Sequence, residues 1–179
     1  GERALCRSFH LYAARERWVP AMKIIVCSDS HGAFTAGEQV LEREKDAVAI
    51  IFLGDGAEEW SDLHEIYPQL PFYAVRGNCD WGSDWAAERV VELGGHRIFC
   101  THGHLYGVKT AGTALLEKRA EEESCDIILY GHTHTARVEY RDGRHILNPG
   151  SLRQPAEGRP SYIELNLDGR NVVPVLVEL

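Results

Sequence analysis

The chain has 179 residues, with 19 lysines and arginines against 27 aspartates and glutamates, so its formal net charge is −8. Hydrophobic residues make up 44% and charged residues 26%, which excludes a disordered or fibrous chain and predicts a single globular domain. The acidic balance argues against a general nucleic-acid surface, and no apolar run approaches the ~20 residues that cross a bilayer, so we expect no membrane partner.

The beginning of the chain differs from the rest. Residues 1–21 are arginine-rich and contain no long apolar core, so they do not resemble a secretory leader. The single methionine, Met22, stands directly before the first strong strand pattern. We therefore expect 1–21 to be an N-terminal extension outside the core and 22–179 to form the domain. A short surface helix is the favoured structure for the extension, and a transit peptide is the alternative.

Strand and helix patterns alternate in the first half of the domain. Thr35 and Glu38 form a capping-box pattern at the start of the first expected helix. The expected strands are 23–27, 48–53 and 72–75, and the expected helices are 35–45 and 61–66. Such a βαβαβ order predicts parallel strands joined by crossover helices.

The second half is dominated by hairpin patterns. Paired strand-like runs flank the dipeptides Gly94-Gly95, Asp142-Gly143 and Asp168-Gly169. Between them, 110–123 predicts a helix with Leu115, Leu116 and Ala120 facing inward, and 126–130 predicts a buried strand. Parallel units followed by hairpins predict an α/β (α+β) fold in which two mixed sheets pack together with helices outside.

Residues of metal-ligand type directly follow the apolar strands. The clusters are Asp29-x-His31, Gly54-Asp55, Gly77-Asn78-Cys79-Asp80, His102-x-His104 and His132-x-His134. Ligands collect beyond the carboxyl ends of strands in open α/β sheets, so one shared site explains all five clusters best. In an extended backbone, residues two apart point to the same side, so we expect Asp29 with His31, and His132 with His134, each to present two ligands together.

The ordered series of motifs resembles the calcineurin-like metallophosphoesterase family, and most of all its small single-domain phosphodiesterases from bacteria and archaea. The resemblance runs from Asp29 to Ser151. It implies a four-layer αββα sandwich, which agrees with the two mixed sheets expected from the strand patterns.

The resemblance also implies two metal sites that share Asp55. One would be formed by Asp29, His31, Asp55 and His134, and the other by Asp55, Asn78, His102 and His132. These ligand types suit Mn, Fe, Zn, Ni or Co, and we expect two divalent ions with Mn as the metal. Metals ~3.5–4 Å apart can hold both oxygens of an in-line displacement while a bridging water is acidified into the nucleophile. This predicts direct hydrolysis of a small phosphodiester, with Asp55, Asn78, Cys79 and His102 as catalytic residues.

One position departs from the larger family. Many members have a histidine where this chain has Cys79, and that histidine is thought to assist departure of the leaving oxygen. A thiol is a poorer proton donor to an alkoxide than an imidazolium, so we expect a preference for diesters with good leaving groups. His104 is a candidate replacement acid, and a buried supporting role is equally compatible. We expect Asp80 to orient a ligand histidine by a hydrogen bond.

Substrate contacts are the least defined feature of the sequence. Arg76, His104 and Tyr106 lie next to the predicted ligands and are our candidates for substrate binding. Three tryptophans, Trp60, Trp81 and Trp85, either wall a substrate pocket or pack in the core, and core packing is favoured.

Other functions and properties remain open at this point. A phosphomonoesterase could use the same metals, and the retromer subunit of this fold is a non-catalytic scaffold. The five cysteines are scattered without a Cys-x-x-Cys pair, which indicates a reducing, cytoplasmic compartment. Exposed hairpin strands are compatible with a homo-oligomer.

Overall fold

The computed structural model describes residues 20–179. The expected extension therefore lies outside the described residues, except for Pro20 and Ala21, which belong to no helix or strand. The limits of the extension and of the domain stay predictions. None of the described helices is long and apolar enough to cross a membrane.

The described residues form two five-stranded sheets. The first has the strand order β10-β9-β1-β2-β3 and the second has the order β4-β5-β6-β8-β7. The strands of the first sheet are β1 (Met22–Cys27), β2 (Ala49–Phe52), β3 (Phe72–Ala74), β9 (Ser161–Asp168) and β10 (Asn171–Glu178). Those of the second sheet are β4 (Glu88–Leu93), β5 (His96–Thr101), β6 (Ile127–Leu129), β7 (Arg137–Arg141) and β8 (Arg144–Asn148).

Both sheets mix parallel and antiparallel pairs, as the sequence predicts. β1, β2 and β3 pair in parallel, and β5, β6 and β8 do so in the second sheet. The three expected hairpins are antiparallel pairs of β4 with β5, β7 with β8, and β9 with β10. The carboxyl ends of the parallel strands in both sheets therefore open toward the loops that carry the predicted ligands.

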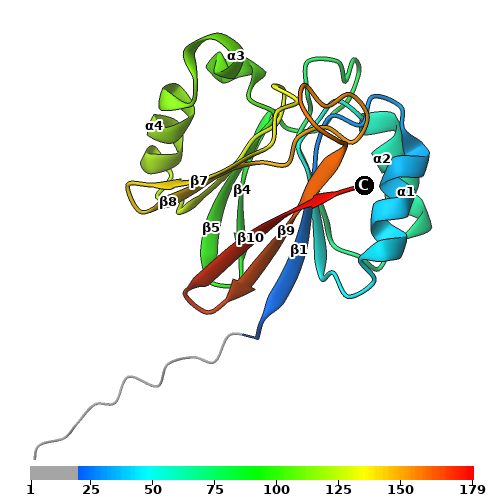
Figure 1. Ribbon diagram of the computed structural model, residues 1–179, viewed down its shortest axis with the longest axis horizontal. Helices are drawn as coiled ribbons and strands as arrows, with labels where there is room; N and C mark the ends of the chain where they lie inside the picture. Colours follow the sequence, from blue (N-terminus) through cyan, green and yellow to red (C-terminus); the bar gives the residue numbers. More distant parts are fainter. Residues whose placement is uncertain (1–19) are drawn as a thin grey trace, which may run out of the picture.

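Helices cover the outer faces of the two sheets. Helices α1 (Phe34–Arg43) and α2 (Ala57–Ile66) lie against the first sheet, and α3 (Val108–Ala111) and α4 (Ala114–Glu122) lie on the side of the second. Figure 1 shows the two sheets between these helix pairs. Alternate residues such as Ile24 and Val26 of β1 pack inward with Ile98 and Leu129 of the other sheet. The predicted four-layer αββα sandwich is confirmed.

Details of the helices differ from the sequence predictions. No side chain caps α1, whose N-cap residue is Ala33, so the expected Thr35–Glu38 capping box is wrong. The helix expected over 110–123 is broken by Gly112, whose φ of 69° is left-handed, and Leu115 on its second part is exposed rather than inward.

Candidate metal centre

Loops that follow five strands meet at one edge of the two sheets. The Asp29 N–H donates to the Gly54 carbonyl at 3.0 Å, and the His31 N–H donates to the Asp55 carbonyl at 2.9 Å. In the second sheet, the Gly131 N–H donates to the His102 carbonyl at 3.0 Å. The predicted convergence of distant motifs is therefore built first by the backbone.

Most of the predicted ligands adopt a left-handed backbone. The positive φ angles are 54° at Asp29, 41° at His31, 60° at Asp55, 70° at His132 and 57° at His134. The extended backbone expected for both pairs is therefore wrong, although Asp29 and His31 still present their ligand atoms to one group, whereas His132 and His134 belong to different groups. Left-handed φ in residues other than glycine is uncommon and concentrates at functional sites, where surrounding contacts hold it in place.

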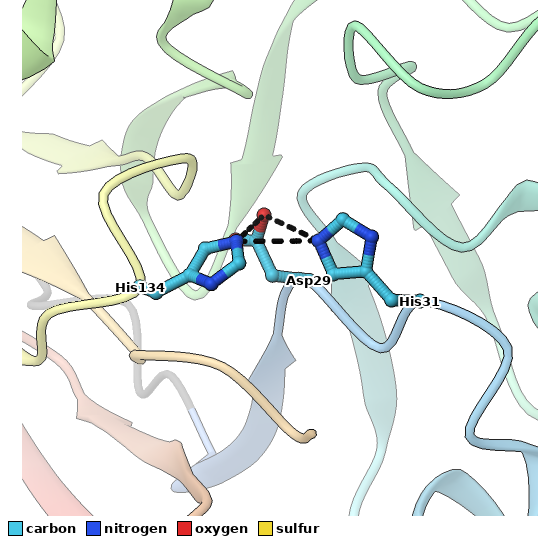
Figure 2. Close-up of side chains that lie close together, drawn as sticks. All are labelled: Asp29, His31 and His134. Atoms are coloured by element: carbon cyan, nitrogen blue, oxygen red, sulfur yellow. Dashed lines mark hydrogen bonds and ion pairs between the residues drawn. The ribbon is translucent and has the colours of Figure 1, made fainter. Parts of the chain in front are cut away.

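Asp29, His31 and His134 form the first group of potential ligands (Figure 2). The Nε2 atoms of the two histidines are 3.2 Å apart, and Asp29 Oδ1 lies 3.2 Å from His134 Nε2 and 3.7 Å from His31 Nε2. Asp29 is fully buried, whereas the two histidine side chains are 21–22% exposed. The three potential ligand atoms thus converge on one point at the rim of the pocket.

Asp55, His102 and His132 form the second group. His102 Nε2 lies 3.2 Å from Asp55 Oδ2 and 3.2 Å from His132 Nδ1. Asp55 Oδ2 also lies 3.8 Å from His31 Nε2, which connects this group to the first one. Asp55 therefore lies between the two groups, as a shared carboxylate must.

Backbone carbonyls orient two of the histidines. His102 Nδ1 donates to the Leu53 carbonyl at 2.7 Å, and His134 Nδ1 donates to the Gln154 carbonyl at 2.8 Å. In the uncharged form of both rings the proton therefore lies on Nδ1, and Nε2 faces the carboxylates. Such carbonyl contacts are the usual means by which proteins fix a metal-binding histidine.

In both Asp29 and Asp55, one carboxylate oxygen accepts hydrogen bonds from the chain and the other faces the histidines. Asp29 Oδ2 accepts from Ser28 Oγ at 2.6 Å and from the His132 N–H at 3.0 Å, while Oδ1 is buried without a hydrogen-bond partner. Asp55 Oδ1 accepts from the Cys79 N–H at 2.8 Å, while Oδ2 faces His102. A buried carboxylate oxygen without a donor is costly, and a bound cation removes that cost.

Electrostatic coupling within the pocket is strong. Burial raises the pKa of Asp29, but the nearby imidazoles of His134 and His31 outweigh it, so its pKa lies well below the usual range. Burial and the neighbouring His102 lower the pKa of His132 to about 4. At neutral pH both groups are therefore in the state that binds a cation, carboxylate and uncharged imidazole.

Asn78 and Cys79 lie in the loop that follows β3. Asn78 is exposed, and its amide nitrogen is 3.4 Å from Cys79 Sγ, so its coordination of a metal stays a prediction. Cys79 Sγ groups with His31 and Asp55. Burial, followed by the charge of Asp55, raises the pKa of the Cys79 thiol, which keeps its proton at neutral pH.

Asp80 has a role that the sequence did not predict. Its Oδ1 accepts from the N–H groups of Gly56 and Ala57, each at 2.9 Å, and its Oδ2 accepts from those of Asp55 and Gly77 at 2.8 and 2.7 Å. The contacts found for Asp80 are thus with backbone rather than with the expected ligand histidine. They join the loops after β2 and β3 and explain why α2 begins at Ala57, before the predicted start.

The three candidate substrate contacts have different surroundings. Arg76 is exposed, and its charge contributes to the lowered pKa of His104, after burial and His102. The ring of His104 lies 5.5 Å from that of His102, and its Nδ1 is buried without a partner. Tyr106 donates its hydroxyl to Glu88 and packs edge-on against Phe99. Their substrate contacts stay predictions.

The turn at 148–151 supports two of the ligand loops. Asn148 Nδ2 donates to the Gly131 carbonyl at 3.1 Å, and Ser151 Oγ donates to the Asp29 carbonyl at 2.7 Å. The guanidinium of Arg153 donates to the His31 carbonyl. Sequence reasoning missed Arg153 because no local pattern connects it with His31, which lies 122 positions earlier, and it missed Ser28 although this residue directly precedes Asp29.

The residues present fit a pair of divalent cations. Six of the seven predicted ligands occur in overlapping groups with nitrogen and oxygen donors, and Asp29 Oδ1 is an orphaned buried oxygen aimed at the histidines. Two carboxylates are fewer charges than two divalent ions carry, so a loaded site would be positive and would attract an anion. The donor set does not select one metal.

Comparisons with known proteins agree with this site. The family model of the calcineurin-like phosphoesterase superfamily domain matches residues 22–170. The probable metallophosphoesterase YsnB of Bacillus subtilis (strain 168) is 38% identical over 151 residues, covering 82% of this chain and 85% of that protein. Phosphodiesterase YfcE of Escherichia coli (strain K12) is 33% identical over 178 residues, covering 85% of this chain and 91% of its own.

A solved structure supports the same assignment. A Streptococcus pneumoniae TIGR4 protein, described as a predicted phosphoesterase, matches with a TM-score of 0.75 and 29% identity over 89% of this chain and 90% of that chain. The family implies divalent metals, and the groups around Asp29 and Asp55 are candidates for holding them. The chain belongs to the calcineurin-like metallophosphoesterase family and is a metal-dependent phosphoesterase similar to small bacterial and archaeal members.

Proposed function

We propose that this chain is a phosphodiesterase that binds two divalent cations, with Mn²⁺ as the expected metal, and hydrolyses its substrate by direct attack of water. The main supporting observation concerns Asp29 and Asp55. In each, one carboxylate oxygen accepts a hydrogen bond from the chain, and the other is buried and faces the histidines. The diester preference is supported by the 33% identity to a protein named a phosphodiesterase.

The ligands divide between two positions. Asp29, His31 and His134 would hold one cation, and Asn78, His102 and His132 the other, with Asp55 shared between them. Bound cations would supply positive charge for the phosphate oxygens and acidify the attacking water. The carbonyls of Leu53 and Gln154 fix two of the rings, so the chain holds these ligand atoms in place in advance.

The reaction forms one bond between the water oxygen and phosphorus and breaks one bond between phosphorus and the leaving oxygen. The leaving alcohol must receive a proton. Cys79 Sγ holds a proton at neutral pH but is a weak donor to an alkoxide, and His104 lies beside His102 on the same pocket. We therefore expect good turnover only where the leaving group needs little protonation.

Parallel assays with a diester and a monoester test this function. The purified chain is stripped with a chelator, reloaded with Mn²⁺, Zn²⁺ or Co²⁺, and assayed with bis(p-nitrophenyl) phosphate and p-nitrophenyl phosphate, with metal content measured on the same samples. We expect loss of activity on chelation, about two ions per chain on reloading, and faster hydrolysis of the diester.

Other results would identify the competing functions. Faster hydrolysis of the monoester would replace our proposal with a phosphomonoesterase. A fully loaded protein that hydrolyses neither ester would indicate a non-catalytic scaffold.

A further inference from the structure

An exposed aromatic side chain stands beside the metal centre. Trp81 is 90% exposed, whereas Trp60 is buried in the core and Trp85 packs against it. Trp81 directly follows Asp80, whose carboxylate accepts four backbone hydrogen bonds. The exposed indole is therefore presented by an anchored loop, and the prediction that the tryptophans pack in the core is wrong for this one.

A cleft of about 390 Å³ connects Trp81 with the metal centre. His31 and Asp55 line it from the centre, Glu58 lines it from the first turn of α2, and Cys79 and Trp81 line it from the loop after β3. We call it the Trp81 cleft. A diester with its phosphorus at the metal ligands has two organic groups, and this cleft offers space for one of them.

The cleft has a negative character. Among the described residues that line it there is no lysine or arginine, and its carboxylates are Asp55, Glu58, Glu59 and Asp80. Glu59 accepts from Ser30 Oγ and from the Gly32 N–H, but Glu58 is exposed to the solvent. The guanidinium of Arg153 donates to the His31 carbonyl and lies near Gly32 at the border of the cleft, but Arg153 does not line it. A negatively charged substituent is therefore disfavoured here.

We propose that the Trp81 cleft binds the leaving alcohol of the phosphodiester and selects an aromatic alcohol without negative charge, whose ring stacks on the indole of Trp81. This inference rests on the proposed phosphodiesterase function. It assigns the cleft to the leaving side because Cys79, at the position that the resemblance associates with the leaving oxygen, also lines it. Aromatic rings pair favourably beyond their buried area, and the nearby carboxylates repel anions.

Three methyl phosphodiesters with alcohols of similar basicity test the selection. Their leaving groups are benzyl, cyclohexylmethyl and 4-carboxybenzyl alcohol. Because such alcohols leave slowly, kcat and KM for the release of each alcohol, rather than of methanol, are measured at a high concentration of the Mn²⁺-loaded protein. We expect the benzyl ester to have the highest kcat/KM. Trp81→Ala should lower kcat/KM for this ester about two- to tenfold, mainly through KM, and leave the cyclohexylmethyl ester within about twofold.

Two further variants separate stacking from charge. Trp81→Phe should retain most of the preference for the benzyl ester because it keeps an aromatic face. Glu58→Lys should raise kcat/KM for the carboxybenzyl ester about threefold or more relative to the benzyl ester. Metal content should be unchanged in all three variants. Equal effects of Trp81→Ala on the benzyl and cyclohexylmethyl esters, or no effect on either, would overturn the inference.

A binding measurement keeps this test apart from the test of the enzymatic function. Methyl 4-nitrobenzyl phosphate should quench indole fluorescence on mixing, before turnover, and Trp81→Phe should lose most of the quench. If no diester is hydrolysed but this difference is found, the phosphodiesterase proposal fails and the cleft remains a binding site for aromatic esters. Equal quenching of the two proteins would contradict the role of Trp81.

Discussion

Strand β1 has a cluster of charged groups at each end, and the two clusters treat their buried carboxylates differently. At its start, Glu44 accepts from Lys23 Nζ at 3.1 Å and from the Tyr162 hydroxyl at 2.5 Å, so each carboxylate oxygen has a donor from the chain. At its end, Asp29 Oδ1 has none. The first arrangement is complete within the protein, whereas the second would be completed by the cation that we propose binds there.

The largest expected effect is at Asp55, the carboxylate that we propose the two cations share. Asp55→Asn should lower kcat/KM about 10³-fold or more and reduce bound metal below one ion per chain. Elemental analysis and diester assays measure both quantities. Thermal melting of the metal-free variant beside metal-free wild type checks that the variant is folded. Near-wild-type turnover of Asp55→Asn would refute the shared position of Asp55. The control variant is Asp62→Asn, because Asp62 lies on the exposed face of α2.

A smaller loss is expected when the support beneath Asp55 is removed. Asp80→Asn replaces one carboxylate oxygen by an amide that cannot accept, so two of its four backbone donors lose a partner. The metal affinity, measured by isothermal titration calorimetry, should fall about 10- to 100-fold. The exposed Asp84 of the same loop provides the control variant Asp84→Asn. Unchanged affinity in Asp80→Asn would mean that the pocket keeps its shape without these bonds.

Variants of Cys79 test which group donates a proton to the leaving oxygen. Cys79→His introduces an imidazole that can donate a proton, so hydrolysis of alkyl diesters should rise roughly tenfold relative to aryl diesters. Cys79→Ser provides a control of similar size without such a donor. The ratio of the two kcat/KM values is the measurement, and an unchanged ratio would argue that His104 or another group serves the leaving oxygen.

The smallest expected effect is at the other end of β1. Lys23→Met removes one donor from the buried Glu44 and should lower the free energy of unfolding by about 1–2 kcal/mol at neutral pH, without changing metal content. Burial raises the pKa of Glu44, but hydrogen bonds from Tyr162 and Lys23 outweigh it, so its folded pKa lies below 4.5. This stabilisation is present above pH 4.5 and is lost as the pH falls through the folded pKa.

Denaturant unfolding of both proteins between pH 3 and 7 should therefore show a difference that shrinks on acidification. Lys45→Met, which removes an exposed lysine paired with Glu42, is the matched control and should change stability by less than about 0.5 kcal/mol. A constant difference between Lys23→Met and wild type across this pH range would show that Glu44 does not depend on Lys23.

The sheets and the order of the ligands were predictable because each depends on short local patterns. Apolar runs such as 48–53 mark strands covered on both faces, and the Gly-Asp and His-x-His motifs mark their carboxyl ends. The break at Gly112 was missed because an isolated glycine in a helical pattern is often tolerated.

The internal geometry of the site was not predictable. The spacing of His132 and His134 is the same in an extended and in a left-handed backbone, so only the folded chain distinguishes them. Asp80 accepts its hydrogen bonds from backbone N–H groups, and no sequence pattern indicates such contacts. The division of the tryptophans into buried Trp60 and exposed Trp81 likewise depends on tertiary placement.

The left-handed backbone at the ligand positions has a consequence for the protein without its metals. Such conformations cost of order 1 kcal/mol or more at each residue, and the surrounding contacts and the cations offset that cost. When a chelator removes the cations, the loops at Asp29, Asp55 and His132 lose part of that compensation, while the strands keep their ladders. Amide hydrogen exchange of the stripped protein should therefore accelerate first in these loops, with β1 and β6 still protected.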